Sequence, residues 1–547
     1  MKRFYRYYVL ALLVLLYLLN FIDRNIIIAL SPYIKSDLHV TDAQLGLLVG
    51  TTFALFYALM GLPLAKLADG WNRVWSLSVG LTLWSIMTCL SGLTFSFSAL
   101  AGARVGVGVG EATTGPAAVS LLGDYFEKEK RATILSIFAG AIYVGSTIAM
   151  AVGGFLLGWW GRIFPDGSAP LGLTAWQGAF FIVGAPGIVL ALLMLLTVKE
   201  PVRGALEGIP TASDPRPFSS ALQEIMAMIP PWSMLRLRRI GGSGPLRTNI
   251  SIAIVVIAVS ALIVWIAGGS LKNSSGPALW IGSISMSTNT VQWTAMGFAV
   301  YALLSWFQTV QLRDPEAKEL VAGSRTFRML LVVTAFNLLV FYSMNAFVFV
   351  YANRYLGFGA QQAFMLGIVG AAMGVIGVVG GGIAGDFFKR LHPAGRVYFM
   401  IASYSGYALL TFVQFSMTDP TWFGIAFAAC ALVGASFNGC NAATAQDLVV
   451  PRLRGTAYAL QALCGNLVGL GLGPYTVGLI SDLTGNLRAA LFAVLATAIM
   501  VPLGLKYVAA RLSESSSGHH QTSQRKFVPT GVSAAAAPPP YPTSRDA

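Results

Sequence analysis

Residues 8–30 have the sequence YVLALLVLLYLLNFIDRNIIIAL, a run of apolar side chains interrupted by Asn20, Asp23, Arg24 and Asn25. A helix of about 20 apolar residues is long enough to cross the hydrocarbon core of a bilayer. Similar runs recur along the 547 residues, which are 56% hydrophobic and 11% charged, with a mean hydropathy of +0.69. Soluble domains carry about 25% charged residues. The sequence therefore predicts an all-α polytopic membrane protein.

The apolar spans fall into two series of six, separated by two further candidates. Because each span is apolar around its whole circumference, each is expected to be a buried or lipid-facing helix. The total predicts about 14 transmembrane helices, arranged as two six-helix halves with a two-helix insert between them. The first series covers roughly 8–30, 44–66, 74–94, 98–122, 132–158 and 178–198, the insert 249–269 and 290–311, and the second series 328–352, 362–385, 396–416, 421–446, 456–481 and 487–510.

Five segments follow from these spans. We expect an N-terminal half at 1–200, a cytoplasmic linker at 201–248, the insert at 249–311, a C-terminal half at 312–512 and a tail at 513–547. The tail is rich in Ser, Ala and Pro, a composition typical of disorder. The linker contains the basic run Leu235–Arg239, and part of it is expected to lie on the membrane surface.

Basic residues alternate between loops. They gather before the first span and after the second, fourth and sixth, while the other loops hold few, Lys272 and Arg354 among them. Since loops rich in Lys and Arg stay in the cytoplasm, we expect both termini there, in a multi-pass protein of the plasma membrane, or the inner membrane of a bacterium. The net charge of +14 has the same explanation and does not predict binding to nucleic acid.

The two series resemble each other at two loops. Asp69 and Arg73 follow the second span as Asp386 and Arg390 follow the eighth, an offset of 386 − 69 = 317 residues. Asp124 precedes Arg131 by seven residues, as Asp447 precedes Arg454, at an offset of 447 − 124 = 323. Duplicated halves place a solute site between them, near the midplane. We expect these eight residues to lie at the cytoplasmic mouth and to latch helices in one conformation.

Four ionisable residues lie inside the spans: Asp23, Arg24, Arg104 and Glu111. Such residues are costly in hydrocarbon, so they mark either a site of solute or proton binding or a structural ion pair. Arg104 and Glu111 are seven residues apart and share a helix face. Asp23 and Arg104 are expected at similar depth, which permits a pair, with Glu111 nearer the middle. Both interpretations stay open at this point.

Catalytic motifs are not found in the sequence. There is no HExxH, Walker loop, nucleophile elbow or metal-binding cluster, so we expect no enzyme activity, no cofactor and no metal. Gly106, Gly108 and Gly110 lie within an apolar span, where close helix packing is the simpler explanation. The four cysteines also lie within spans and lack metal-ligand spacing.

Several motifs resemble the major facilitator superfamily, and more narrowly its Spinster branch. They include Asn20–Arg24, Gln44–Leu48, Arg104–Ala112, Pro116–Ala118 with Asp124–Phe126, and Lys199–Pro201 with Arg203–Gly204. The resemblance implies twelve core helices, alternating access, proton linkage and, as in animal members, export of sphingosine phosphate or lysophospholipid. It further implies that Asp23, Arg104 and Glu111 face the cavity. Ala65 and Gly70 depart from the usual loop motif, which implies a weaker first latch.

Together these features predict a proton-linked secondary transporter for a small amphipathic or anionic solute. Its expected partners are the solute, protons and membrane lipid, and it is expected to act as a monomer. A drug or organic-anion transporter is the main alternative. A non-transporting receptor or scaffold is the other, and the charges inside the membrane argue against it. The insert, whose spans hold no Asp, Glu, Lys or Arg, is expected to lie against lipid outside the solute path.

Overall fold

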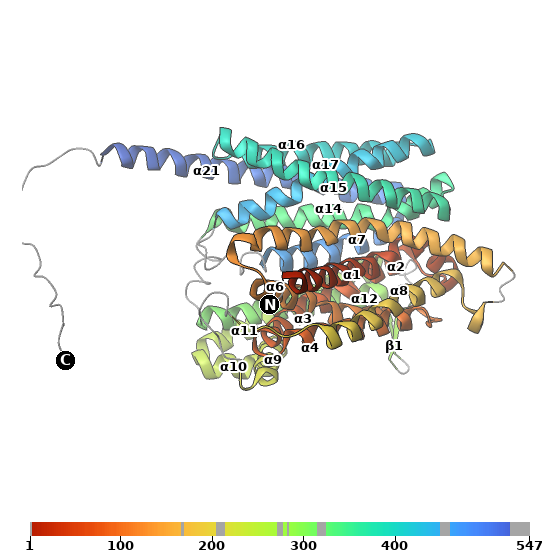
Figure 1. Cartoon of the computed structure of the whole chain (residues 1–547), viewed down its shortest axis with the longest axis horizontal. Helices are drawn as coiled ribbons and strands as arrows, with labels where there is room; N and C mark the ends of the chain where they lie inside the picture. Colours follow the sequence, from red (N-terminus) through yellow and green to blue (C-terminus); the bar gives the residue numbers. More distant parts are fainter. Residues whose placement is uncertain are drawn as a thin grey trace, which may run out of the picture.

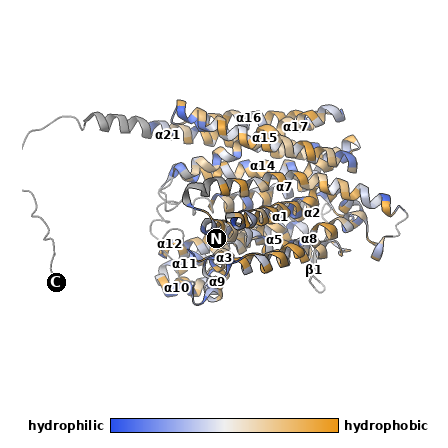
Figure 2. Ribbon diagram, in the orientation of Figure 1, coloured by the Kyte–Doolittle hydropathy of each residue, from blue (hydrophilic) through white to orange (hydrophobic). Residues whose placement is uncertain are grey.

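A bundle of long helices makes up the protein (Figure 1). The computed structural model describes residues 3–165, 169–203, 214–270, 277–281, 284–313, 324–448 and 460–525. Within these residues eleven helices are long and apolar enough to cross a membrane, or twelve when the two parts of a helix bent by 42° are counted as one span. Figure 2 shows apolar residues along most of these helices. The all-α polytopic class is confirmed, while the count of 14 stays a prediction.

The N-terminal half contains eight α-helices. Two expected spans are each divided: the second at Gly50, and the fourth at Ala112 and Thr113, directly after Glu111. The helices are α1 (Arg3–Leu38), α2 (Asp42–Val49), α3 (Thr51–Gly70), α4 (Arg73–Ser91), α5 (Phe97–Glu111), α6 (Thr114–Tyr125), α7 (Lys128–Ile163) and α8 (Ala175–Thr197), with a short 3₁₀ turn, η1 (Pro170–Gly172), before α8.

The C-terminal half repeats this plan. It comprises α14 (Arg325–Leu356), α15 (Ala360–Leu391), α16 (Gly395–Ser416), α17 (Pro420–Asp447), the π-helical η4 (Gly465–Leu470), α19 (Gly471–Thr484), α20 (Leu487–Ala496), the 3₁₀ turn η5 (Thr497–Ile499) and α21 (Met500–Arg525). The expected disordered tail begins at residue 513, but α21 continues to Arg525, and 526–547 lie outside the described residues.

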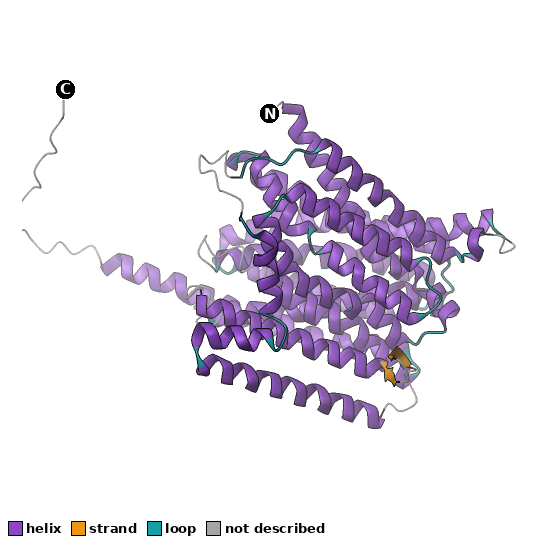
Figure 3. Cartoon of the chain, turned by 90° about the horizontal axis from the view of Figure 1, so that it is seen from below, coloured by secondary structure: helices purple, strands orange, loops and turns teal. Residues whose placement is uncertain are grey.

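The linker and the insert lie between the halves in sequence. The linker carries two short helices, α9 (Pro217–Met226) and α10 (Trp232–Gly241). The insert consists of α11 (Ser243–Ser270), the antiparallel strands β1 (Pro277–Ile281) and β2 (Ile284–Ser287), and α12 (Thr288–Arg313). Figure 3 shows this strand pair near one end of an otherwise helical bundle. Lys272, expected in the loop between the two insert helices, lies outside the described residues.

Polar residues at the helix ends explain where many of the elements begin and stop. The side chains of Thr41, Asn72 and Ser96 accept hydrogen bonds from backbone N–H groups of α2, α4 and α5, which have no partner within the helix. At the end of α14, Gly357 adopts φ +68°, a left-handed conformation that glycine takes without a steric penalty. Side-chain and glycine caps thus divide the apolar sequence into separate spans.

The two largest apolar clusters lie mainly within one half each. One joins α14, α15, α16, α17, α20 and α21 and also includes Ala29, Leu45 and Met150 of the N-terminal half. The other joins α1, α3, α4, α6, α7 and α8 and also includes Leu470 of the C-terminal half. In Figure 1, α14 to α17 lie as a group beside the helices of the N-terminal half. Since helices alternate in direction, the starts of α1, α4, α14 and α16 share one end of the bundle, called here the basic end. The starts of α2, α5 and α15 lie at the opposite end.

Backbones of the two halves touch at the opposite end. A Cβ atom at Gly46 would overlap the carbonyl oxygen of Pro474, one at Gly50 that of Leu470, and one at Gly478 that of Asp42. Helices α2 and α19 approach this closely only because glycine has no side chain. The halves are therefore closed tightly against each other at this end.

Candidate solute and proton site

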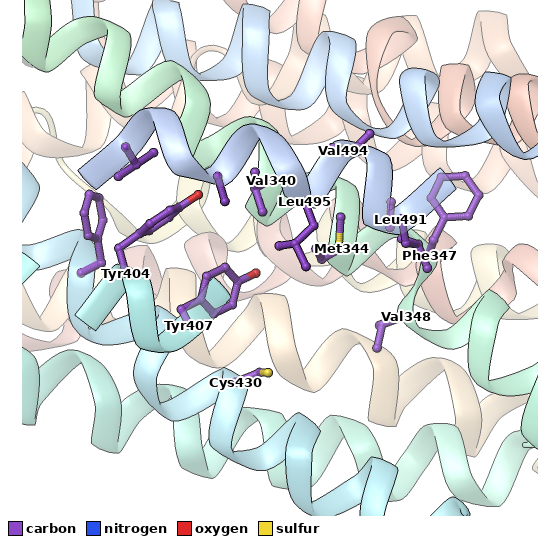
Figure 4. Close-up of a cluster of buried hydrophobic side chains, with 14 of the residues drawn as sticks. Val340, Met344, Phe347, Val348, Tyr404, Tyr407, Cys430, Leu491, Val494 and Leu495 are labelled. Atoms are coloured by element: carbon purple, nitrogen blue, oxygen red, sulfur yellow. The ribbon is translucent and has the colours of Figure 1, made fainter. Parts of the chain in front are cut away.

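A cavity of about 260 Å³ lies between the two halves. Most of its wall comes from α14 to α17, and the remainder from α1, α2, α7 and η4. Figure 4 shows four of the lining side chains, Met344 and Val348 on α14 with Tyr407 and Cys430, inside the apolar cluster of the C-terminal half. Aromatic and aliphatic side chains dominate this wall, so it suits an apolar group of a ligand.

Arg24 supplies the positive charge of the cavity wall. Its guanidinium lies over the rings of Phe53 and Tyr57, with its central carbon 4.1 and 4.7 Å from the ring centroids. The Nε and Nη2 atoms have no hydrogen-bond partner, and no carboxylate of the described residues lies within ion-pair distance. Stacking on aromatic rings holds the cation without neutralising it. Arg24 is therefore held beside the cavity with two of its nitrogens buried and unpaired.

Two polar side chains accompany Arg24 on the same wall. Asn25 follows it on α1 and donates a hydrogen bond from Nδ2 to the Ser146 hydroxyl on α7, at 3.4 Å. Both residues line the cavity. The wall of the N-terminal half thus carries one cation and two polar side chains among apolar ones, while the facing wall is mostly apolar.

Arg104 and Asp23 are neighbours, but the pair that the sequence permits is not formed between their charged groups. Arg104 donates to the backbone carbonyl oxygens of Asp23 and Arg24, each at 3.2 Å. The Asp23 carboxylate accepts a long bond of 3.5 Å from the Thr88 hydroxyl, and its other oxygen has no partner. The sequence could not predict this geometry, because it depends on the rotation of α1 against α5.

Glu111 is fully buried, and neither carboxylate oxygen has a hydrogen-bond partner. It ends α5 at the break before α6, and it interacts electrostatically with both Arg24 and Arg104. Asn20, also buried, has an unpaired side-chain nitrogen. Asp23, Arg104 and Glu111 do not line the cavity, contrary to expectation; they lie within the N-terminal half, and Arg24 alone of the four reaches the cavity wall.

Polar contacts join the halves at the opposite end. Asp42, at the start of α2, forms ion pairs with Arg354 at 2.8 Å and with Lys35, and it accepts a bond from Ser481. The Asp482 carboxylate accepts the backbone N–H groups of Asp42 and Ala43 at 2.9 and 2.7 Å. A carboxylate at a helix N-terminus is favoured by the helix dipole. The C-terminal half therefore caps α2 of the N-terminal half.

At the basic end, Arg73 is the centre of a buried ion cluster. It binds Asp124 and, through Nε at 2.6 Å, Glu200. The predicted pair with Asp69 is not among the ion pairs of the described residues; the Asp69 backbone carbonyl instead accepts from Arg203. Burial lowers the pKa of the Arg203 guanidinium.

The C-terminal half has a matching cluster around Arg396. Its guanidinium binds Asp386 and Asp447, each at 2.6 Å, and Lys389 also binds Asp447 at 2.6 Å. The sequence groups Asp386 with Arg390, but Arg396 of α16 is its partner instead. Arg390 is exposed and forms no ion pair within the described part of the chain. The side chain of Arg131 and the whole of Arg454 lie outside the described residues.

Sequence reasoning missed Glu200, Arg396, Asp42 and Asp482. A signal for Arg396 existed, because its offset from Arg73, 396 − 73 = 323, equals the 323 between Asp124 and Asp447. Among the described residues no group of His, Cys, Asp and Glu could hold a metal ion. Gly108 and Gly110 pack against the backbones of Phe53 and Trp84, which confirms their role in close helix packing.

Residues 13–474 match the family model described as Major Facilitator Superfamily. The chain is 24% identical over 486 residues to "Protein spinster homolog 1" of Xenopus tropicalis, covering 87% of this chain and 74% of that one. It is 36% identical over 196 residues to an "MFS-type efflux pump" of Mycolicibacterium smegmatis, covering 36% of this chain and 42% of the pump, less than half of the pump's length.

Solved structures agree with this similarity. The fold matches a bacterial homologue of the human lysosomal transporter Spinster in an inward-facing, unoccupied conformation. That match has a TM-score of 0.64 and 25% identity, and it covers 94% of this chain and 99% of the other.

Proposed function

The chain belongs to the Major Facilitator Superfamily and is Spinster-like, and from this membership and the cavity we propose that it carries an amphipathic anion by alternating access, coupled to protons. The observation that carries the proposal is the contrast between one charged side chain and its surroundings in the cavity. Arg24 is the charged residue among those that line the cavity, and the rest of the lining is mostly apolar and aromatic.

This contrast supports a solute with a charged head and an apolar body. A carboxylate or phosphate fits the planar donor fork of Arg24, with Asn25 and Ser146 beside it. The apolar body fits against Phe341, Phe415 and Phe427. A lysophospholipid or a sphingoid phosphate has this chemistry.

Proton coupling is supported by the position of Glu111. A buried carboxylate without a partner is costly when ionised, so it favours the protonated form. Arg24 acts electrostatically on Glu111. An anion bound at Arg24 would weaken that effect, so solute binding favours protonation of Glu111. The link between Arg24 and Glu111 thus couples solute to proton.

Sidedness follows from the distribution of basic loops. We assign the basic end, with both termini, to the cytoplasm of the plasma membrane, or of the inner membrane in a bacterium. The contacts of Asp42 and the glycines then close the outer end. That closure fits an inward-facing state. We further propose that the transporter acts as a monomer, with the solute, protons and membrane lipid as its partners.

A drug or organic-anion transporter is the second candidate. It is favoured by the aromatic C-terminal wall and by the similarity of part of the chain to an efflux pump. Such a transporter would accept varied compounds, including neutral ones, and would depend less on Arg24.

Reconstitution in liposomes tests the proposal. Purified protein is assayed with a lysophospholipid, a sphingoid phosphate, a sugar, an organic anion and a neutral dye, with and without a pH gradient. We expect uptake of the amphipathic anions, stimulated by the gradient, and a loss of at least tenfold for Arg24→Gln. The control variant is Arg162→Gln, at an exposed arginine of α7. If the parent protein transports neutral compounds and Arg24→Gln transports them at the same rate, the second candidate is favoured.

A further inference from the structure

Helix α12 of the insert lies across the seam between the two halves. Its residues Met296, Ala299 and Leu303 pack with Leu55 of α3 and Leu467 of η4 in one apolar cluster. The partner helix α11 is largely exposed. Only 6% of its apolar 18-residue stretch is buried, compared with 44% of the corresponding stretch of α12. The expectation that the insert lies against lipid therefore fits α11 but not α12.

A buried polar residue of α12 bonds to both halves at once. The Thr51 hydroxyl, at the start of α3, lies 2.5 Å from Gln292 Oε1. Gln292 Nε2 donates to the Gly471 carbonyl oxygen of α19 at 3.0 Å. The Thr51 hydroxyl also lies 2.5 Å from that carbonyl oxygen, so its single hydrogen has two acceptors within reach, one on α12 and one on α19. Gln292 and Thr51 are almost fully buried.

A second bond extends this contact toward the opposite end. Tyr475 of α19 donates to Asn289 of α12 at 3.1 Å, and both residues are buried. These contacts lie next to Gly50 of the N-terminal half and Leu470 of the C-terminal half, whose backbones touch. Helix α12 thus covers the outer part of the closed seam.

We propose that Gln292 is a positioning residue of the transport cycle, which holds α3 and α19 together and so stabilises the state that is closed at the opposite end. The argument rests on the proposed function in one respect, that the halves separate at this end during the cycle. When they separate, Gln292 follows one half only, and at least one buried polar group loses its partner. Such a loss is unfavourable, so the hydrogen bonds of Gln292 shift the equilibrium toward the state that is closed at the opposite end.

The test measures opening without any solute. A cysteine at Asn345, in the cavity wall, is introduced after replacing Cys89, Cys430, Cys440 and Cys464. Its labelling by a membrane-impermeant maleimide from the opposite side reports how often that end opens. Gln292→Met keeps the length and shape of the side chain and removes both bonds. We expect labelling to become faster by about tenfold.

The matched control is Asn249→Leu. Asn249 is buried in the same hairpin, and its side-chain hydrogen bonds within the described residues go to Ser305, Gln308 and Tyr301, all on α12. We expect its labelling rate to equal that of the parent. Equal acceleration in Asn249→Leu would mean that any damage to the hairpin suffices, and it would overturn the proposal, as would an unchanged rate in Gln292→Met.

A second variant covers the case in which Gln292→Met does not fold. Thr51→Val removes the hydroxyl that contacts both Gln292 Oε1 and the Gly471 carbonyl oxygen, and faster labelling is again expected. Folding is checked by gel filtration. Since the readout needs no transport, a failure of this proposal is distinguishable from a failure to transport any amphipathic anion.

Discussion

The charged residues inside the N-terminal half differ in how completely they are paired. Arg104 binds two carbonyl oxygens, whereas Glu111 has no hydrogen-bond partner and Arg24 retains two unpaired nitrogens. A buried polar group without a partner is unfavourable by roughly 1–3 kcal/mol or more. All four charged residues therefore keep at least one buried polar atom without a partner, and Glu111 and Arg24 keep two each.

Glu111→Gln is expected to fold and to bind solute, but to lose stimulation by a pH gradient. Glutamine has nearly the same shape as a protonated glutamate. It stays uncharged at every pH, so the proton-dependent step is removed. Transport is measured in liposomes at equal and unequal pH on the two sides. Full stimulation in the variant would show that another group couples protons.

Arg104→Lys is expected to destabilise the protein by about 2 kcal/mol although the charge is kept. A lysine ammonium cannot reach two successive backbone carbonyls with the geometry of a guanidinium. Thermal unfolding in detergent is compared with that of Arg162→Lys, which changes an exposed arginine bonded to one carbonyl oxygen. Equal stability of Arg104→Lys and the parent would mean that charge alone matters at this position.

At the scale of elements, the contact between α2 and α19 depends on missing side chains. The positions of Gly46 and Gly478 admit backbone atoms of the facing helix. Packing of this kind tolerates almost no added volume, because the atoms in contact belong to backbones that cannot move aside. Closure of the opposite end is thus a property of two helices and not of any single ion pair.

Gly46→Ala is expected to prevent complete closure and to increase access to the cavity from the opposite side. The added methyl would overlap the Pro474 carbonyl oxygen. Labelling of a cysteine at Asn345 provides the measurement, and Gly61→Ala on the adjoining helix α3 is the control, since a Cβ there meets no atom within 4 Å. Unchanged labelling in Gly46→Ala would show that the seam adapts.

For the whole molecule, the two halves and their basic loops define an orientation. A cysteine at Ser285, in β2 between the insert helices, is expected to react with an impermeant reagent in intact cells. One at Leu222, on the exposed face of α9, is expected to react only after permeabilisation. Labelling of position 222 in intact cells would reverse the assignment of the basic end to the cytoplasm.

The sequence predicted the class of fold because apolar length is a local property of each span, and it predicted the family through short motifs such as Arg104–Ala112. It also placed Asp23, Arg24, Arg104 and Glu111 in one half. It could not predict which charges meet, since partners such as Asp386 and Arg396 depend on the rotation and register of packed helices. The position of α12 could not be predicted for another reason. Gln292 is uncharged, and the amino-acid composition of α12 does not distinguish it from a lipid-facing helix.

The glycine contacts at the closed end have a consequence for the electrical behaviour of the membrane. A seal made of side-chain rotamers opens on nanosecond timescales, whereas backbones in contact part only when whole domains move, over microseconds to milliseconds. Between transport events, protons and small ions therefore find no transient path along α2 and α19. We expect membranes that contain this protein to hold a voltage as well as protein-free ones, and their conductance to rise only while solute is carried.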